Sequence, residues 1–145
     1  MTALAIPEHL RAALYAHALA AFPAEACGYL TGPPDGDHVD ALVACRNAQA
    51  DGEHPLAPDR GADTGFVIAG AELLAFARTF DSHAPARIVY HSHTNGRAYL
   101  SQIDRMMAIG SGYPVQQLVI GVAGGSVLDV AQFDRDLIEV ARWRP

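Results

Sequence analysis

The chain has 145 residues, of which 50% are hydrophobic, and its formal net charge is −6, with no lysine among its ten basic residues. This length predicts one domain, residues 1–145, with a core large enough to fold without disulfides. The acidic balance disfavours nucleic-acid binding, and no apolar run reaches the roughly 20 residues of a membrane span, so we expect a cytoplasmic protein with no membrane segment.

The first half of the chain predicts one helix, one hairpin and a long loop. Leu10, Leu14 and Ala18 share one face of a helix expected over about residues 7–22. The segments that follow are two hairpin strands, a polar loop, a short strand and a second helix, at about residues 25–31, 38–46, 48–64, 66–68 and 70–82. The second helix is expected to carry an apolar side made of Leu73, Leu74, Ala77 and Phe80.

The second half predicts a strand, a helix and two or three further strands. Their expected bounds are 87–93, 101–109, 118–122, 127–133 and 137–143, and a helix is the alternative for the last. Cys27 and Cys45 are expected on neighbouring strands as small buried thiols rather than as a disulfide. Together these segments predict an α+β domain, in which a curved and largely antiparallel sheet is packed against helices.

The most informative pattern is H-x-H-x7-S-x2-D, formed by His91, His93, Ser101 and Asp104. Side chains two apart on a strand point to the same face, so both imidazoles project together from the end of the 87–93 strand. Residues three apart on a helix also share a face, so the hydroxyl and the carboxylate can turn back toward the imidazoles. Three protein ligands with one open position are typical of a catalytic zinc site.

Ordinary structural roles are the alternatives for each of these residues. Ser101 and Asp104 also have the spacing of a helix capping box, in which each side chain accepts a backbone N–H. A single strand histidine is usually a core or surface group. The combination of two histidines with the Ser/Asp pair favours a metal site, and Ser101 can cap the helix and serve the site at once.

This pattern, together with Glu25-Ala26-Cys27-Gly28, resembles the JAMM/MPN family of zinc-dependent peptidases and isopeptidases. The resemblance implies a single JAMM/MPN domain with an α+β, cytidine-deaminase-like fold and one Zn²⁺ per chain. It implies that His91, His93 and Asp104 hold the zinc, that Glu25 is the general base, and that Ser101 donates a hydrogen bond to the oxyanion. By position alone, Glu25 would be a solvated carboxylate that follows a helix.

The bacterial Mec subgroup is the most similar at Ala98-Tyr99 and at Thr94, a position where many family members have proline. Leu100 is more like eukaryotic members. The resemblance implies a substrate that is a ubiquitin-like sulfur-carrier protein with a Gly-Gly terminus, from which cysteine or a peptide is released. Arg97 and Tyr99 are candidate walls for the Gly-Gly tail, although a loop arginine is by default a solvated charge.

Of three other functions, two stay open at this point and one is excluded. One is a general bacterial, deubiquitinase-like isopeptidase, and a second is a non-catalytic MPN scaffold that binds partners. The third, a zinc nucleoside deaminase, requires H-x-E and a downstream P-C-x-x-C, and the sequence has neither. Because members of the family tend to pair, the resemblance also allows a homodimer.

Overall fold

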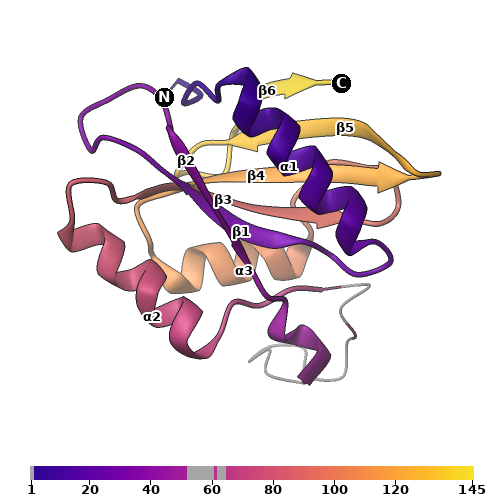
Figure 1. Ribbon diagram of the computed structural model, residues 1–145, viewed down its shortest axis with the longest axis horizontal. Coiled ribbons are helices and arrows are strands. Elements are labelled where there is room, and N and C mark those ends of the chain that lie inside the picture. The colour runs from indigo at the N-terminus through magenta and orange to yellow at the C-terminus, as the bar shows by residue number, and fades with distance from the viewer. Residues whose placement is uncertain (1, 52–60, 62–64) are drawn as a thin grey trace.

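The computed structural model of the protein describes residues 2–51, 61 and 65–145, which form a single sheet with helices on both sides (Figure 1). The helices are α1 (Glu8–Ala21), α2 (Gly70–Arg78) and α3 (Gln102–Ser111), with 3-10 turns η1 (Ala48–Asp51) and η2 (Thr79–Asp81). The strands are β1 (Cys27–Thr31), β2 (Ala41–Cys45), β3 (Ala86–His93), β4 (Gln116–Ala123), β5 (Ser126–Phe133) and β6 (Glu139–Trp143).

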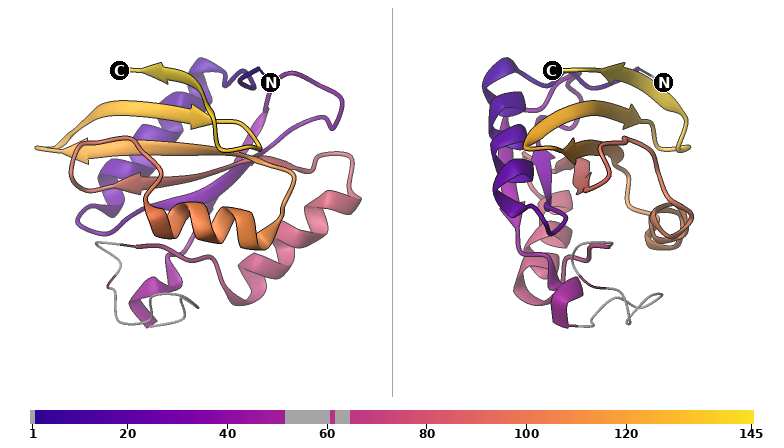
Figure 2. Two further views of the ribbon diagram at one scale, coloured as in Figure 1. Left: turned by 180° about the vertical axis from the view of Figure 1, so that it is seen from behind. Right: turned by 90° about the vertical axis from the view of Figure 1, so that its right-hand side faces the viewer.

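The six strands lie in the order β2-β1-β3-β4-β5-β6, and every neighbouring pair is antiparallel except β3 and β4. Parallel neighbours need a crossover connection, and α3 supplies it here. This crossover places α3 on the face of the sheet opposite to α1 (Figure 2). The predicted α+β fold with a largely antiparallel sheet is thereby confirmed.

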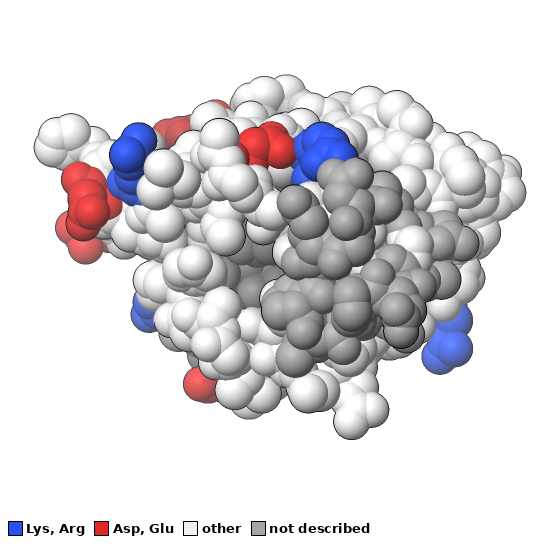
Figure 3. All heavy atoms as spheres, turned by 90° about the horizontal axis from the view of Figure 1, so that it is seen from below, with Lys and Arg blue, Asp and Glu red and all other residues white. Residues whose placement is uncertain are grey.

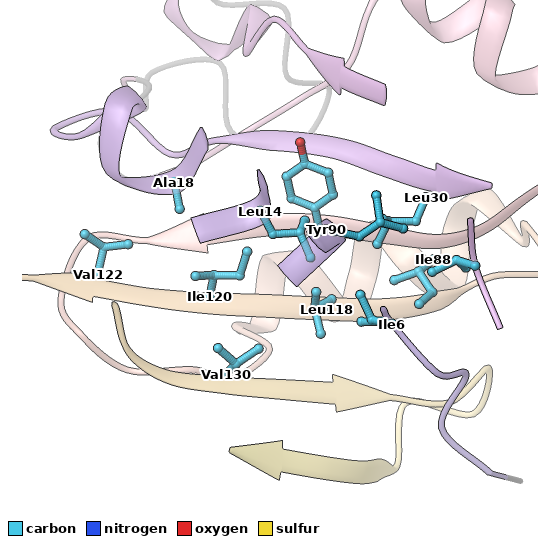
Figure 4. Packing of buried hydrophobic residues seen from close by; sticks show 12 residues of the cluster. Ile6, Leu14, Ala18, Leu30, Ile88, Tyr90, Leu118, Ile120, Val122 and Val130 are labelled. Atoms are coloured by element: carbon cyan, nitrogen blue, oxygen red, sulfur yellow. The ribbon is translucent and has the colours of Figure 1, made fainter. Parts of the chain in front are cut away.

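The main core lies between α1 and one face of the sheet. Leu10, Leu14 and Ala18 of α1 are all buried, as their spacing predicts. They belong to a cluster that includes Tyr90 of β3 and Ile120 of β4 (Figure 4). Full burial of one large aliphatic side chain stabilises a fold by about 1.5–3 kcal/mol, so this face carries much of the domain's stability.

Alternation along β3 separates this core from the polar centre of the domain. Ile88 and Tyr90 point into the α1 core, whereas His91 and His93 point to the other face. Two smaller apolar clusters occupy that second face, one around Cys27, Tyr29 and Phe76 and the other around Leu100, Val119 and Phe133.

Several predicted elements differ from the observed ones. Residues 66–68 form no strand; the Val67 carbonyl accepts the Ala48 N–H, and the Val67 N–H donates to the Asn47 side chain. The second helix ends at Arg78 and continues as η2, and its buried residue is Phe76, whereas Leu73 and Leu74 are 39% and 51% exposed.

The remaining differences are small. α3 continues to Ser111 and ends at Gly112, whose positive φ of 65° is the usual left-handed conformation of a helix C-terminus. The tail forms the strand β6 rather than the alternative helix. Most of the predicted 48–64 loop lies outside the described residues, apart from η1 and residue 61. Among the described residues, no helix is long and apolar enough to cross a membrane.

Candidate active site

His91 and His93 lie side by side at the C-terminal end of β3, a strand in the interior of the sheet. His91 is 0% exposed and His93 6% exposed. Their Nε2 atoms are 3.1 Å apart, and the ring centroids are 4.9 Å apart. The period of the strand therefore brings the two imidazoles together, as the sequence predicts.

Asp104 reaches the same point from the first turn of α3. Its Oδ2 atom lies 3.1 Å from Nε2 of His91 and 3.2 Å from Nε2 of His93. The same oxygen accepts the Ser101 backbone N–H at 2.9 Å, while the Ser101 hydroxyl accepts the Asp104 N–H at 3.1 Å. The pair thus forms a complete capping box, and the cap fixes the orientation of the carboxylate toward the imidazoles.

The three ligand atoms form a nearly equilateral triangle with edges of 3.1–3.2 Å. In a tetrahedral zinc site with bonds of roughly 2.0–2.1 Å, neighbouring ligand atoms are about 3.3–3.4 Å apart. The residues therefore fit a small tetrahedral cation with little rearrangement, and two nitrogens with one oxygen form a typical catalytic zinc ligand set.

Glu25 approaches from the other side of the cluster, just before β1. It is 6% exposed, and one carboxylate oxygen lies within 4.8 Å of one ring nitrogen from each of His91 and His93. This Glu-His-His group can hold a metal ion. Glu25 is not part of the 3.1–3.2 Å triangle, so its position suits a group that acts on a molecule bound in the fourth tetrahedral position.

Two polar side chains that the sequence analysis missed hold the backbone around Glu25. Ser92 accepts the Ala26 N–H at its hydroxyl (2.7 Å) and donates its own N–H to the Ala26 carbonyl (3.0 Å). Asn47 donates to the carbonyls of Glu25 (3.0 Å) and Gly65 (2.9 Å). For Ser92 the sequence offers a partial signal, because a serine between two histidines on a strand points to the face opposite to theirs. The sequence does not show that its partner is the Ala26 N–H.

Phe66 also escaped prediction. Its ring stacks on the His91 ring, with centroids 4.3 Å apart and planes at 16°. This contact restricts rotation of the imidazole. No local sequence pattern predicts this stacking, because Phe66 belongs to the segment for which we predicted a strand.

Burial, neighbouring charges and hydrogen bonds shift the pKa values of Asp104, His91 and His93 in different directions. Burial opposes ionisation of Asp104, but the two imidazoles and the Ser101 N–H outweigh it and hold the pKa of that carboxyl well below its usual range. Burial likewise opposes protonation of His91, yet the Asp104 and Glu25 carboxylates raise its pKa. At His93 burial prevails, aided by His91, and the pKa is lowered.

Tyr99 and Arg97 extend the site on the side of His93. The Tyr99 ring meets the His93 ring at a centroid distance of 4.6 Å. The Arg97 guanidinium carbon lies 5.3 Å from the centroid of the Tyr99 ring. The Arg97 side chain is exposed, and the backbone of Arg97 lies within hydrogen-bonding reach of His93. The structure therefore places both predicted wall residues beside His93.

An apolar cavity of about 130 Å³ opens on the other side, against His91 and Asp104. Its walls come from residues 65–68, α2 and α3, and include Phe66, Leu73 and Met107. The face that carries α2 and α3 shows few charged side chains (Figure 3). Of the predicted apolar side of the second helix, Leu73 lines this cavity and Leu74 is 51% exposed. The buried residue of α2 is Phe76, which the prediction did not include.

The fold and the site define an α+β domain whose sheet presents a His-His-Asp triangle and a buried glutamate to one face. The chain belongs to the family described as prokaryotic homologs of the JAB domain, whose model matches residues 7–136. The resemblance to the JAMM/MPN family that the sequence suggested is therefore confirmed.

Proteins from Mycobacterium bovis and Mycobacterium tuberculosis, each named CysO-cysteine peptidase, are 30% identical to the chain over 105 residues. The match covers 72% of this chain and 65% of each relative, slightly less than two thirds of their length. Two solved structures have the same fold. A JAB1/MPN domain protein from Archaeoglobus fulgidus is 16% identical, with a TM-score of 0.58 over 97% of this chain and 95% of that one. A protein from Desulfitobacterium hafniense is 22% identical, with a TM-score of 0.61 over 97% and 88%.

Proposed function

We propose that this protein is a cytoplasmic JAMM-type zinc peptidase that hydrolyses the bond after the C-terminal Gly-Gly of a ubiquitin-like sulfur-carrier protein. The observation that carries the proposal is the triangle of ligand atoms with 3.1–3.2 Å edges, because its size matches a tetrahedral zinc site. His91, His93 and Asp104 would hold one Zn²⁺ per chain, which when bound polarises a water molecule and lowers its pKa toward neutrality.

Glu25 would act as the general base. Its carboxylate takes a proton from the attacking water and delivers it to the nitrogen of the leaving amine as the C–N bond breaks. The burial of Glu25 and its distance of at most 4.8 Å from the ring nitrogens support this role. Water attacks the carbonyl carbon directly, and the products are a Gly-Gly carboxylate and a free amine.

Ser101 would stabilise the developing oxyanion. Its oxygen accepts the Asp104 N–H, so the hydroxyl proton can be donated to the carbonyl oxygen of the substrate. A donor of this kind is typically worth about 2.7–4 kcal/mol in the transition state.

The name of the mycobacterial relatives supports a sulfur-carrier substrate from which cysteine is released. The apolar cavity beside His91 and Asp104 supports binding of an extended tail, because Gly-Gly is thin and can lie in a narrow groove between α2 and α3. A homodimer stays a prediction.

The decisive experiment is the intact mass of a sulfur-carrier protein ending in Gly-Gly-Cys after incubation with zinc-loaded wild type or Glu25→Gln, together with the zinc content of both proteins. We expect wild type alone to remove one cysteine residue and both proteins to contain one equivalent of zinc. Loss of zinc from Glu25→Gln would instead make Glu25 a ligand. No cleavage by the zinc-loaded wild type would contradict this substrate.

The two alternative functions, a general isopeptidase and a non-catalytic scaffold, can each be tested. Faster cleavage of Gly-Gly-lysine isopeptide conjugates than of Gly-Gly-Cys would establish a general isopeptidase. Protein purified without chelators and still free of zinc would point to a non-catalytic scaffold.

A further inference from the structure

A second hollow lies next to Tyr99, on the side of the site opposite to the apolar cavity. Residues 96–99, which follow β3, form one wall, and the other walls come from Leu128, Asp129, Arg142 and Arg144. Three of its lining residues are arginines, although the chain as a whole carries a net charge of −6. This local excess of positive charge suits a bound anion.

Internal contacts engage one of the three arginines. Arg142 forms ion pairs with Asp129 and Glu139 and donates to the Ala98 carbonyl at 2.9 Å. Arg97 and Arg144 have no ion pair within residues 2–51, 61 and 65–145, and both are exposed. The hollow therefore offers two guanidinium groups whose charge the described residues do not neutralise.

The hollow also lies within reach of the reaction centre. Two successive contacts, of 4.6 Å from His93 to Tyr99 and 5.3 Å from Tyr99 to Arg97, place the Arg97 guanidinium within about 10 Å of the His93 ring. In a peptide, the carboxyl carbon of the residue after the scissile bond is about 2.5 Å from the scissile nitrogen, and each further residue adds roughly 3.5 Å. A leaving group of two or three residues spans this gap, and a single residue reaches the guanidinium where the exposed Arg97 side chain turns toward the site.

We propose that Arg97 and Arg144 bind the free C-terminal carboxylate of the segment released after Gly-Gly. The inference rests on the proposed function and narrows its substrate class to carriers with a short C-terminal extension, as opposed to isopeptide conjugates. In an isopeptide the leaving amine is a lysine side chain, which brings no terminal carboxylate to this position. The Gly-Gly arm then lies in the apolar cavity, and the released residues lie over Tyr99.

The test compares a carrier ending in Gly-Gly-Cys as the free acid with the same carrier ending in the carboxamide. Because charge-assisted pairs with arginine are strong, we expect wild type to prefer the acid by about tenfold to hundredfold in kcat/KM, mainly through KM. Arg97→Gln and Arg144→Gln should each reduce the preference for the acid, and the double variant should abolish it by lowering kcat/KM on the acid.

Arg135→Gln is the matched control. Arg135 is exposed in the β5–β6 turn, at the end of these strands opposite to the hollow, so its replacement should leave the acid preference unchanged. Circular dichroism and thermal melting of each variant verify that the fold is intact.

Equal rates for acid and amide with wild type would overturn the inference and leave the proposed function standing. A double variant impaired equally on both substrates would also overturn it and assign the arginines to an acidic surface of the carrier body. If wild type cleaves neither substrate, the proposed function fails. Calorimetric binding of the two carriers to Glu25→Gln then tests the carboxylate site independently of cleavage. Tighter binding of the acid supports the carboxylate site, and equal binding refutes it.

Discussion

Replacement of Ser101 by alanine separates two roles that one hydroxyl has in this structure. The oxygen accepts the Asp104 N–H at 3.1 Å and thereby closes the N-terminal cap of α3. The hydroxyl proton is the group proposed to donate to the oxyanion. Alanine removes both interactions, whereas Ser101→Thr keeps a hydroxyl that can make both.

The two losses have different magnitudes. Loss of a serine cap costs about 1 kcal/mol of stability, which lowers Tm by roughly 2–4 °C for a domain of this size. Loss of an oxyanion donor costs about 3 kcal/mol in the transition state and lowers kcat by roughly 10²–10³. Because Asp104 still accepts the Ser101 backbone N–H, which alanine retains, we expect the zinc content to stay at one equivalent.

The assay combines initial rates of cysteine release, followed by intact mass, with thermal melting and zinc analysis. We expect Ser101→Ala to lose at least a hundredfold in kcat with a small decrease in Tm, and Ser101→Thr to stay near wild type. An alanine variant within fivefold of the wild-type kcat, with zinc bound, would refute the oxyanion role. A loss of activity that parallels a loss of zinc would show that Ser101 acts by holding Asp104.

Two further predictions concern the fold around Glu25. Gly28→Ala places a methyl carbon 2.6 Å from the Tyr90 hydroxyl oxygen and against the Val43 carbonyl, so we expect a loss of at least about 2 kcal/mol in urea denaturation; an unchanged midpoint would contradict this packing. Burial raises the pKa of both the Cys27 and Cys45 thiols to about 12, so iodoacetamide at pH 8 should modify neither in the native protein and both after unfolding. Since the unfolded thiols ionise near pH 9, the free energy of unfolding should fall as pH rises from about 9 toward 12, and a cysteine-free variant should lose part of this dependence.

The site residues could be predicted where a local period decides the geometry. His91 and His93 are two apart on a strand, and Ser101 and Asp104 are three apart on a helix, so each pair shares a face whatever the rest of the fold does. The capping interpretation of Ser101 and Asp104 is confirmed, and the capped carboxylate also points at the imidazoles. The metal interpretation stays a prediction with which this arrangement is compatible.

Prediction from the sequence failed for segments whose conformation and burial depend on their tertiary neighbours. Phe66, Val67 and Ile68 have the composition of a strand, but within residues 2–51, 61 and 65–145 no strand pairs with them. The segment instead lines the cavity, and Phe66 stacks on His91. Leu73 has the spacing of a core residue, and it borders the same cavity. An apolar side that faces a hollow and one that faces a packed core have the same sequence pattern, so only the tertiary structure distinguishes them.

The candidate site is assembled from three chain segments, around Glu25, His91–His93 and Ser101–Asp104, and hydrogen bonds to the backbone hold them. Ser92 and Asn47 hold the peptide unit that follows Glu25, and the capping box fixes Asp104. The imidazoles stand on a strand with neighbours on both sides. A site held in this way is already formed before a substrate binds, which is the condition for electrostatic stabilisation of a transition state without a cost of rearrangement. The two hollows beside the site differ in chemistry, because one is apolar and the other is basic. In the proposed reaction this difference would determine which way round the substrate binds.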